Sequence, residues 1–230
     1  MNTQIIKNRI YIEKITGIAI FTALARIVTL LCKPIPQIQN FLAVDLKSAV
    51  IVIASFIYGP IPGVIIALLT ALIEMITISD TGLYGFVMDF ASAATFVFVS
   101  AFIYKYFRNI NGVIIAFMSA IFATTGVMLL LNKFVTPLYL SLTLGMPPEV
   151  ANSTVISLLP TVLLPFNAFK TALNAGLALM LYKPLLAALS KAGIVTTKSA
   201  SLNFNRNTVI IIIVGSVLLV ASIIALFIIA

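Results

Sequence analysis

The sequence predicts an all-α membrane protein with six or seven spanning helices. Hydrophobic residues make up 62% of the 230-residue chain, and only 9% of the residues are charged. Long apolar runs alternate with short segments that contain proline, glycine or polar residues. A spanning helix needs about 20 mostly apolar residues, so the chain has room for roughly six or seven of them. Little remains for a soluble domain.

Proline and glycine mark most of the expected helix ends, because proline lacks a backbone donor and disfavours helical geometry in the residue before it. Such breaks follow the first and second helices, and a longer loop with Pro137, Gly145, Pro147 and Pro148 follows the fifth. The sixth helix is expected to be broken near Pro160 or Pro165. The expected helices are 10–31, 45–58, 64–79, 84–106, 112–131 or a little beyond, 155–189 and 208–230.

The helices are expected to form one six-helix membrane domain, 1–192, followed by a polar linker, 193–207, and an additional spanning helix, 208–230. The first segment is cationic and then apolar, like a signal peptide. We interpret it as a retained span, because it is long, keeps Arg26 and has no clear cleavage site. The last helix could serve as a membrane anchor or as a lateral contact surface, and the sequence does not decide between these roles.

The charges are best explained by membrane topology. The net charge is +8, and the lysines and arginines gather in alternate loops on the side of the N-terminus. Cytoplasmic loops carry such an excess, so the N-terminus is expected in the cytoplasm of a cell-membrane protein, with no nucleic-acid partner.

Enzyme chemistry is not expected. The chain has no histidine and one cysteine, which argues against a metal centre or a disulfide framework. It also has no Walker A motif and no nucleophile constellation, so any ATPase must be another polypeptide.

One polar stripe interrupts the apolar segment 155–181. Asn167, Lys170, Thr171 and Asn174 are spaced three, four and seven residues apart, which places them on one helix face. A cation at bilayer depth costs about 2.5 to 3.5 kcal/mol on insertion scales, so Lys170 needs a partner or a ligand.

Two acidic side chains also lie within predicted spans. Glu74 shares a face with Thr70 and Thr77, and Asp89 lies on the next helix. Lys170 could pair with Glu74 or Asp89 and simply join helices, or it could bind a ligand. Asn132 could be an ordinary helix-ending residue or a site residue, because its amide offers both donors and an acceptor.

The first helix carries Ala19 and Ala23, a small-xxx-small spacing that lets another helix approach closely. The pattern fits a partner interface as well as internal packing. Arg26, one turn further on, is interpreted as a buried pair or a snorkelling charge.

Taken in order, several segments of residues 10–192 resemble the substrate-binding S component of energy-coupling factor (ECF) transporters, and among these the riboflavin-specific members. The segments are Ala19-xxx-Ala23, Val44-Asp45-Leu46, the sequence FIYGPIPG at 56–63, LNKFVTPLY at 131–139 and LPFNAFK at 164–170. The last two point to riboflavin.

The resemblance implies a six-helix bundle with a vitamin site near the outer face, covered by the loop between the first two helices. It also implies an ECF transmembrane coupling protein and two ABC-type ATPases as partners, with riboflavin as the transported substrate and no cofactor. The implied polar contacts to riboflavin are Asn132, Asn167 and Lys170, with Glu74 and Asp89 as neighbours of Lys170. Phe41, Leu42 and Val44 are implied to cover the ring system. Ala19 and Ala23 are implied to contact the coupling protein.

Other functions remain open from the sequence. The chain could be an S component for another vitamin, a secondary transporter in which Glu74 or Asp89 relays protons, or a structural subunit without a ligand. It departs from the family plan in the helix 208–230 and in a loop, 143–154, that is longer than expected.

Overall fold

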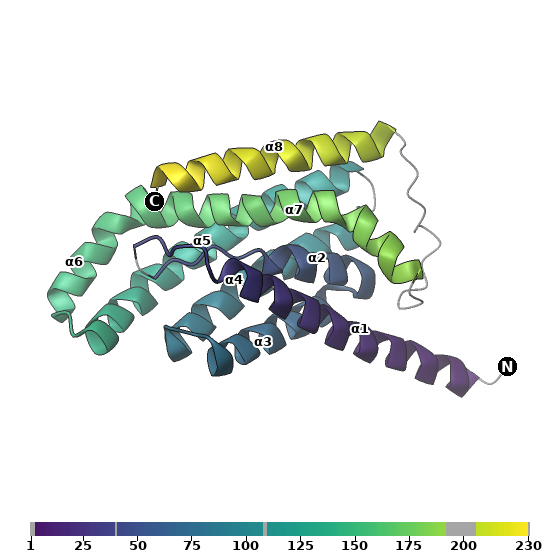
Figure 1. Ribbon diagram of the computed structural model, residues 1–230, viewed down its shortest axis with the longest axis horizontal. Coiled ribbons are helices and arrows are strands. Elements are labelled where there is room, and N and C mark those ends of the chain that lie inside the picture. Colours follow the sequence, from purple (N-terminus) through teal and green to yellow (C-terminus); the bar gives the residue numbers. More distant parts are fainter. Residues whose placement is uncertain (1–2, 40, 108–109, 192–205, 230) are drawn as a thin grey trace.

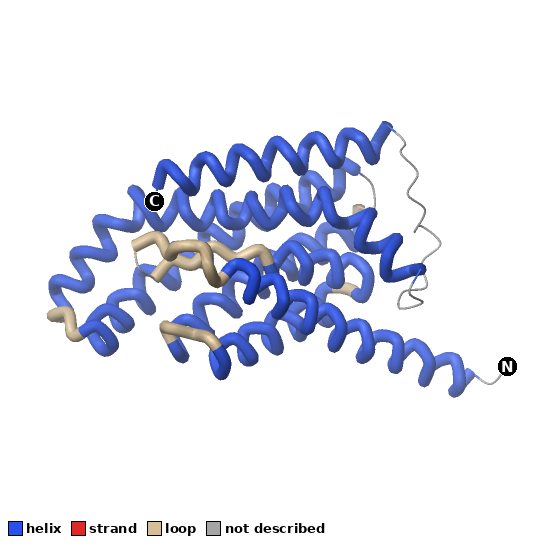
Figure 2. The backbone as a smooth tube through the Cα atoms, viewed as in Figure 1, coloured by secondary structure: helices blue, strands red, loops and turns tan. Residues whose placement is uncertain are grey.

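A computed structural model describes residues 3–39, 41–107, 110–191 and 206–229, and within these ranges the chain is helical with short connections (Figure 2). The predicted all-α membrane fold is confirmed. The elements are α1 (Thr3–Cys32), α2 (Lys47–Tyr58), α3 (Pro60–Thr77), α4 (Gly82–Tyr106), α5 (Ile110–Leu144), α6 (Pro148–Leu158), the π-helical stretch η1 (Leu159–Leu163), α7 (Leu164–Lys191) and α8 (Arg206–Ile229).

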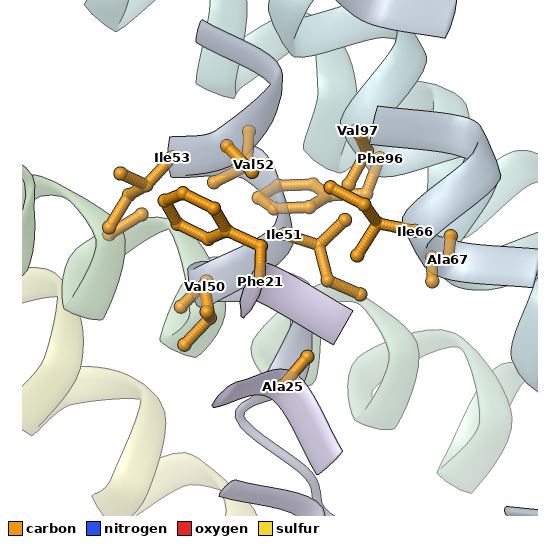
Figure 3. Close-up of a cluster of buried hydrophobic side chains, with 14 of the residues drawn as sticks. Phe21, Ala25, Val50, Ile51, Val52, Ile53, Ile66, Ala67, Phe96 and Val97 are labelled. Atoms are coloured by element: carbon orange, nitrogen blue, oxygen red, sulfur yellow. The ribbon is translucent and has the colours of Figure 1, made fainter. Parts of the chain in front are cut away.

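Helix α2 forms the centre of the bundle. It has only 12 residues, and the side chains of 47–55 are all buried. Helices α1, α3, α4 and α7 each pack against it. Phe21 of α1, Ile51 of α2 and Phe96 of α4 meet in the core around it (Figure 3). A helix surrounded by protein is apolar on every side, which explains why α2 shows no polar face beyond its first turn.

Among the described residues, six helical segments are long and apolar enough to cross a membrane, and α2 is a shorter apolar helix. Figure 1 shows α1 to α7 gathered in one bundle, with the N-terminal half of α1 projecting from one end and α6 at the other.

The end of α5 corrects the sequence prediction. The expected loop around Pro137 is helical, and α5 continues to Leu144. Only residues 145–147 connect it to α6, so the long loop expected at 143–154 was also wrong. Neighbouring helices satisfy backbone groups freed by proline inside a membrane bundle, which lets a helix continue through Pro137. Gly145 makes the turn with a φ of 69°.

The predicted break near Pro160 or Pro165 is instead a change of helix type. The chain stays helical from Pro148 to Lys191, with η1 between α6 and α7. Proline removes a helical donor, and a π-helical turn is one way in which a helix accommodates the loss. Such turns often lie beside functional sites, and the polar stripe follows within four residues of this one.

Helix α8 lies along α7 at the edge of the bundle (Figure 1). The two helices cross where Gly176 faces Gly215, and a Cβ atom added at Gly176 would lie 2.8 Å from the Gly215 carbonyl oxygen. Most of the predicted linker, 193–207, lies outside the described residues, so the division into a six-helix domain and an added helix stays a prediction.

Candidate ligand-binding site

A cavity of about 170 Å³ opens at the end of the bundle opposite the N-terminus. Its walls come from the loop between α1 and α2 and from α3, α4, α5 and α7. All eight residues that the sequence analysis proposed for a ligand line this cavity: Phe41, Leu42, Val44, Glu74, Asp89, Asn132, Asn167 and Lys170. Their role in binding stays a prediction.

Asn174 fixes the loop that covers this cavity. Its Oδ1 accepts a hydrogen bond of 2.9 Å from the backbone N–H of Ala49, in the first turn of α2. Its Nδ2 donates to the backbone oxygen of Asp45, also at 2.9 Å. The first N–H groups of a helix have no partner within it, so this amide of α7 supplies a cap for α2 from a distant part of the chain.

Lys170 pairs with Asp45, which corrects the expected pairing with Glu74 or Asp89. The Nζ atom lies 2.7 Å from Asp45 Oδ2 and 5.9 Å from the centre of the Phe166 ring. The two charged side chains are largely buried, at 17% and 10% exposed. Burial opposes ionisation of Asp45, but the Lys170 and Lys47 cations hold its pKa below the usual value.

Glu74 and Asp89 instead share Lys47. The Lys47 ammonium contacts Glu74 of α3 and lies 2.7 Å from Asp89 of α4. Its side chain is only 1% exposed. Sequence reasoning missed this role of Lys47. The available signal was its position in the first turn of an otherwise apolar helix.

Asn132 and Asn167 are buried, and part of the hydrogen-bonding capacity of each side chain is used by nearby residues of the same helical segment. Asn132 Nδ2 donates to the Met128 oxygen at 2.7 Å, and its Oδ1 accepts from Thr136 at 2.9 Å. Asn167 Nδ2 donates to the Leu163 oxygen at 2.7 Å. A carboxamide has two N–H groups and a carbonyl with two lone pairs, so each side chain has capacity for a ligand.

The loop between α1 and α2 provides the apolar cover. The backbones of Ile38 and Leu42 form an isolated bridge, and both side chains are buried. Phe41 reaches over to Tyr139 of α5, with 6.5 Å between the ring centres, and Tyr139 also contacts Tyr84 of α4 at 5.9 Å.

The same loop is tied to the turn between α3 and α4. Lys33 pairs with Asp80 and donates to the Ile78 oxygen at 3.2 Å. Gln37 donates to Asp80 at 3.4 Å. An apolar cavity with a few converging polar groups is the usual form of a small-molecule site.

Ala19 and Ala23 lie on α1 and are not among the residues that line this cavity. Both are exposed, together with Thr16 and Ile27 on the same face. Helix α1 packs against α2 and α3 through its other side. The small-residue face therefore has no internal partner among the described helices.

Comparisons with known proteins agree with this architecture. The riboflavin transporter RibU of Staphylococcus aureus (strain TCH60) is 27% identical over 178 residues, which cover 75% of this chain and 90% of the relative. The riboflavin transporter FmnP of Bacillus subtilis (strain 168) is 26% identical over 162 residues, covering 69% and 84%.

A solved structure of the S component of a bacterial ECF transporter superposes with a TM-score of 0.61 and 28% identity, covering 76% of this chain and 96% of that one. The matched shares leave out about a quarter of this chain. The model of the family "ECF transporter, substrate-specific component" matches residues 13–182, which end just after the middle of α7. This chain therefore belongs to the family of substrate-specific components of ECF transporters.

Proposed function

We propose that this chain is the riboflavin-binding subunit of an ATP-driven ECF uptake transporter. The observation that carries the proposal is the cavity that Asn132, Asn167 and Lys170 line together with apolar residues of the loop between α1 and α2. Its membership of the family and the names of two relatives support the same substrate.

The chemistry of the cavity suits a flavin. Riboflavin has a flat apolar ring system, and one edge of the ring carries carbonyl groups and an imide N–H. The carboxamides of Asn132 and Asn167 can supply both donors and acceptors to that edge, and the Lys170 ammonium supplies donors. Aromatic side chains around Phe41 and Tyr139 offer apolar surface to the ring faces.

The position of the cavity supports capture from outside. The cavity lies at the end of α1 that ends with Cys32, whereas the basic residues gather toward the N-terminal end. Cytoplasmic loops carry such residues, so we place the N-terminus inside the cell and the cavity at the outer face of the cell membrane.

For release inside, the subunit associates with a transmembrane coupling protein and two ABC-type ATPases. The exposed Ala19 and Ala23 face supports docking of the coupling protein on α1. Small residues let two helices approach closely in lipid, where packing rather than hydrophobicity drives association. We retain the division into a binding domain, 1–192, a linker, 193–207, and an added helix, 208–230, as part of this proposal.

The direct test is the visible absorption spectrum of the detergent-purified protein after loading with riboflavin and extensive washing. We expect a retained yellow flavin near one per chain. A folded protein that stays colourless would reject riboflavin as a tight ligand. Thiamine, folate and biotin would then be the next ligands to measure.

Replacement of Asn167 or Lys170 by alanine is expected to weaken riboflavin binding by about tenfold or more, because each change removes hydrogen bonds to a buried ligand. Riboflavin titration followed by flavin fluorescence measures this. Thr161→Ala, an exposed site in η1, is the control and should leave the affinity unchanged. Affinities equal to that of the unmodified protein in both site variants would remove these residues from the site.

Replacement of Ala19 and Ala23 by tryptophan is expected to abolish riboflavin uptake by cells while leaving riboflavin binding intact, because bulk on this face blocks helix approach. Uptake of labelled riboflavin and binding to the purified protein are measured in parallel. Normal uptake by the double variant would refute docking on this face.

A further inference from the structure

Asp45 has a carboxylate oxygen without a partner in the wall of the cavity. The residue is 7% exposed and lines the cavity. Its Oδ2 atom contacts Lys170, whereas its Oδ1 atom is buried without a hydrogen bond in the described structure. The backbone N–H of Lys47 lies close to this carboxylate and favours its charged form, but Oδ1 accepts no hydrogen bond within the described residues.

A buried acceptor without a donor is costly, and folded proteins seldom leave one. The backbone of Asp45 cannot easily move away, because Asn174 holds its carbonyl oxygen. The residue belongs to the loop between α1 and α2 and lines the cavity, so a ligand bound in the cavity lies beside it. The ligand is therefore the natural source of the missing donor.

The charges around Asp45 do not balance. Three carboxylates, those of Asp45, Glu74 and Asp89, face two ammonium groups, those of Lys47 and Lys170. Asp89 likewise keeps one buried oxygen, Oδ2, without a partner. At the rim, Asp80 and Lys33 neutralise each other. With all five groups ionised, the cluster of Asp45, Glu74, Asp89, Lys47 and Lys170 carries one excess negative charge.

We propose that Asp45 is a further ligand-contacting residue, which accepts a hydrogen bond from a hydroxyl of the ribityl chain and makes the site select riboflavin over phosphorylated flavin. This inference rests on the proposed function. A neutral polyol supplies donors without adding charge. The phosphate of flavin mononucleotide carries about −1.5 to −2 charges at neutral pH and would meet a site in which carboxylates outnumber ammonium groups.

Three ligands test this inference on the purified protein: riboflavin, lumiflavin, which has the same ring but a methyl group in place of the ribityl chain, and flavin mononucleotide. The unmodified protein is expected to bind riboflavin at least about tenfold more tightly than either of the others. Equal affinity for riboflavin and lumiflavin would overturn the inference and leave the proposed function intact. Absence of riboflavin binding would overturn both.

Asp45→Asn keeps the shape of the side chain and removes its charge. We expect it to weaken riboflavin by about fivefold, since a hydrogen bond to a charged group is replaced by a neutral one, and to change lumiflavin much less. Equal losses for the two ligands would mean that Asp45 acts only by positioning Lys170, and would refute direct contact.

Asp89→Asn removes one negative charge without touching the Asp45 and Lys170 pair. The ratio of the dissociation constants of flavin mononucleotide and riboflavin is expected to fall by about tenfold, because one charge interaction with the phosphate is removed in a partly buried site. Asp80→Asn is the matched control, because Asp80 is exposed and paired with Lys33 at the rim. An unchanged preference in Asp89→Asn, or an equal change in Asp80→Asn, would refute the role of charge in selection.

Discussion

Lys47 shows how a single buried cation joins three helices. It begins α2, and its ammonium lies between carboxylates of α3 and α4. A buried ion pair is poor evidence of net stability, because taking charges out of water costs several kcal/mol per ion. Loss of one partner is a different matter, since it leaves the other charges buried and unbalanced.

Lys47→Met is therefore expected to destabilise the protein by about 3 to 5 kcal/mol, because Glu74 and Asp89 would lose their shared counter-ion. Thermal unfolding in detergent measures the loss. The triple variant with Lys47→Met, Glu74→Gln and Asp89→Asn should recover most of it, because no buried charge is left unpaired. A melting temperature of Lys47→Met equal to that of the unmodified protein would show that the buried lysine is not needed to balance these carboxylates.

Asn174 illustrates what a residue pattern can and cannot predict. Its place on the polar stripe with Asn167 and Lys170 followed from helical spacing alone. Its partners did not, because Ala49 lies 125 residues away in the sequence and meets it only when α2 packs against α7. The same limit explains why Lys170 was assigned the wrong carboxylates.

Helices α7 and α8 approach each other closely where a glycine of one helix faces a glycine of the other. Gly176 and Gly215 face each other with no room for a side chain. Small residues at such a crossing allow contact between helix backbones in lipid. Helix α8 is therefore packed on the bundle through a specific surface.

Gly176→Ala is expected to lower stability by about 1 to 3 kcal/mol, because the new methyl group would lie 2.8 Å from a backbone oxygen of α8. Gly126→Ala in α5 is the matched control, because no atom outside its own helix turn lies within 4 Å of the new Cβ. That control should be neutral or slightly stabilising, since alanine is a better helix former than glycine. Equal melting temperatures for the two variants would contradict tight α7 and α8 packing.

The helices around prolines 137 and 160 show why element boundaries were less predictable than element number. In water, each proline would be expected to end or kink its helix. Inside this bundle, α5 continues through Pro137 and a π-helical stretch accommodates Pro160. The packing of neighbouring helices decides between these outcomes, and that packing is absent from a local sequence pattern.

At the scale of the whole molecule, the two ends of the bundle differ, and each end is expected on a different side of the membrane. Figure 1 places the N-terminus of α1 at one end and α6 at the other. Lys14 of α1 and Ser153 of α6 are both exposed, and the native Cys32 is buried. These positions allow the orientation to be measured with single cysteines.

With an inward N-terminus, Ser153→Cys is expected to react with a membrane-impermeant thiol reagent on intact cells. Lys14→Cys should react only after the cells are permeabilised. The unmodified protein, with its buried Cys32, is the control for background labelling. Labelling of Lys14→Cys alone on intact cells would reverse the proposed orientation and place the cavity at the inner face.

The fold class followed from the sequence because lipid leaves few choices. Long apolar runs must satisfy their backbone groups internally, so they become helices, and charges within them must face the interior. That reasoning singled out Glu74, Asp89 and Lys170, whereas the resemblance to S components supplied Asn132 and the loop residues that also line the cavity. The pairing of Lys47 with Glu74 and Asp89, and of Lys170 with Asp45, depends on how distant helices meet, because opposite charges can pair in several combinations until packing brings one combination within contact distance.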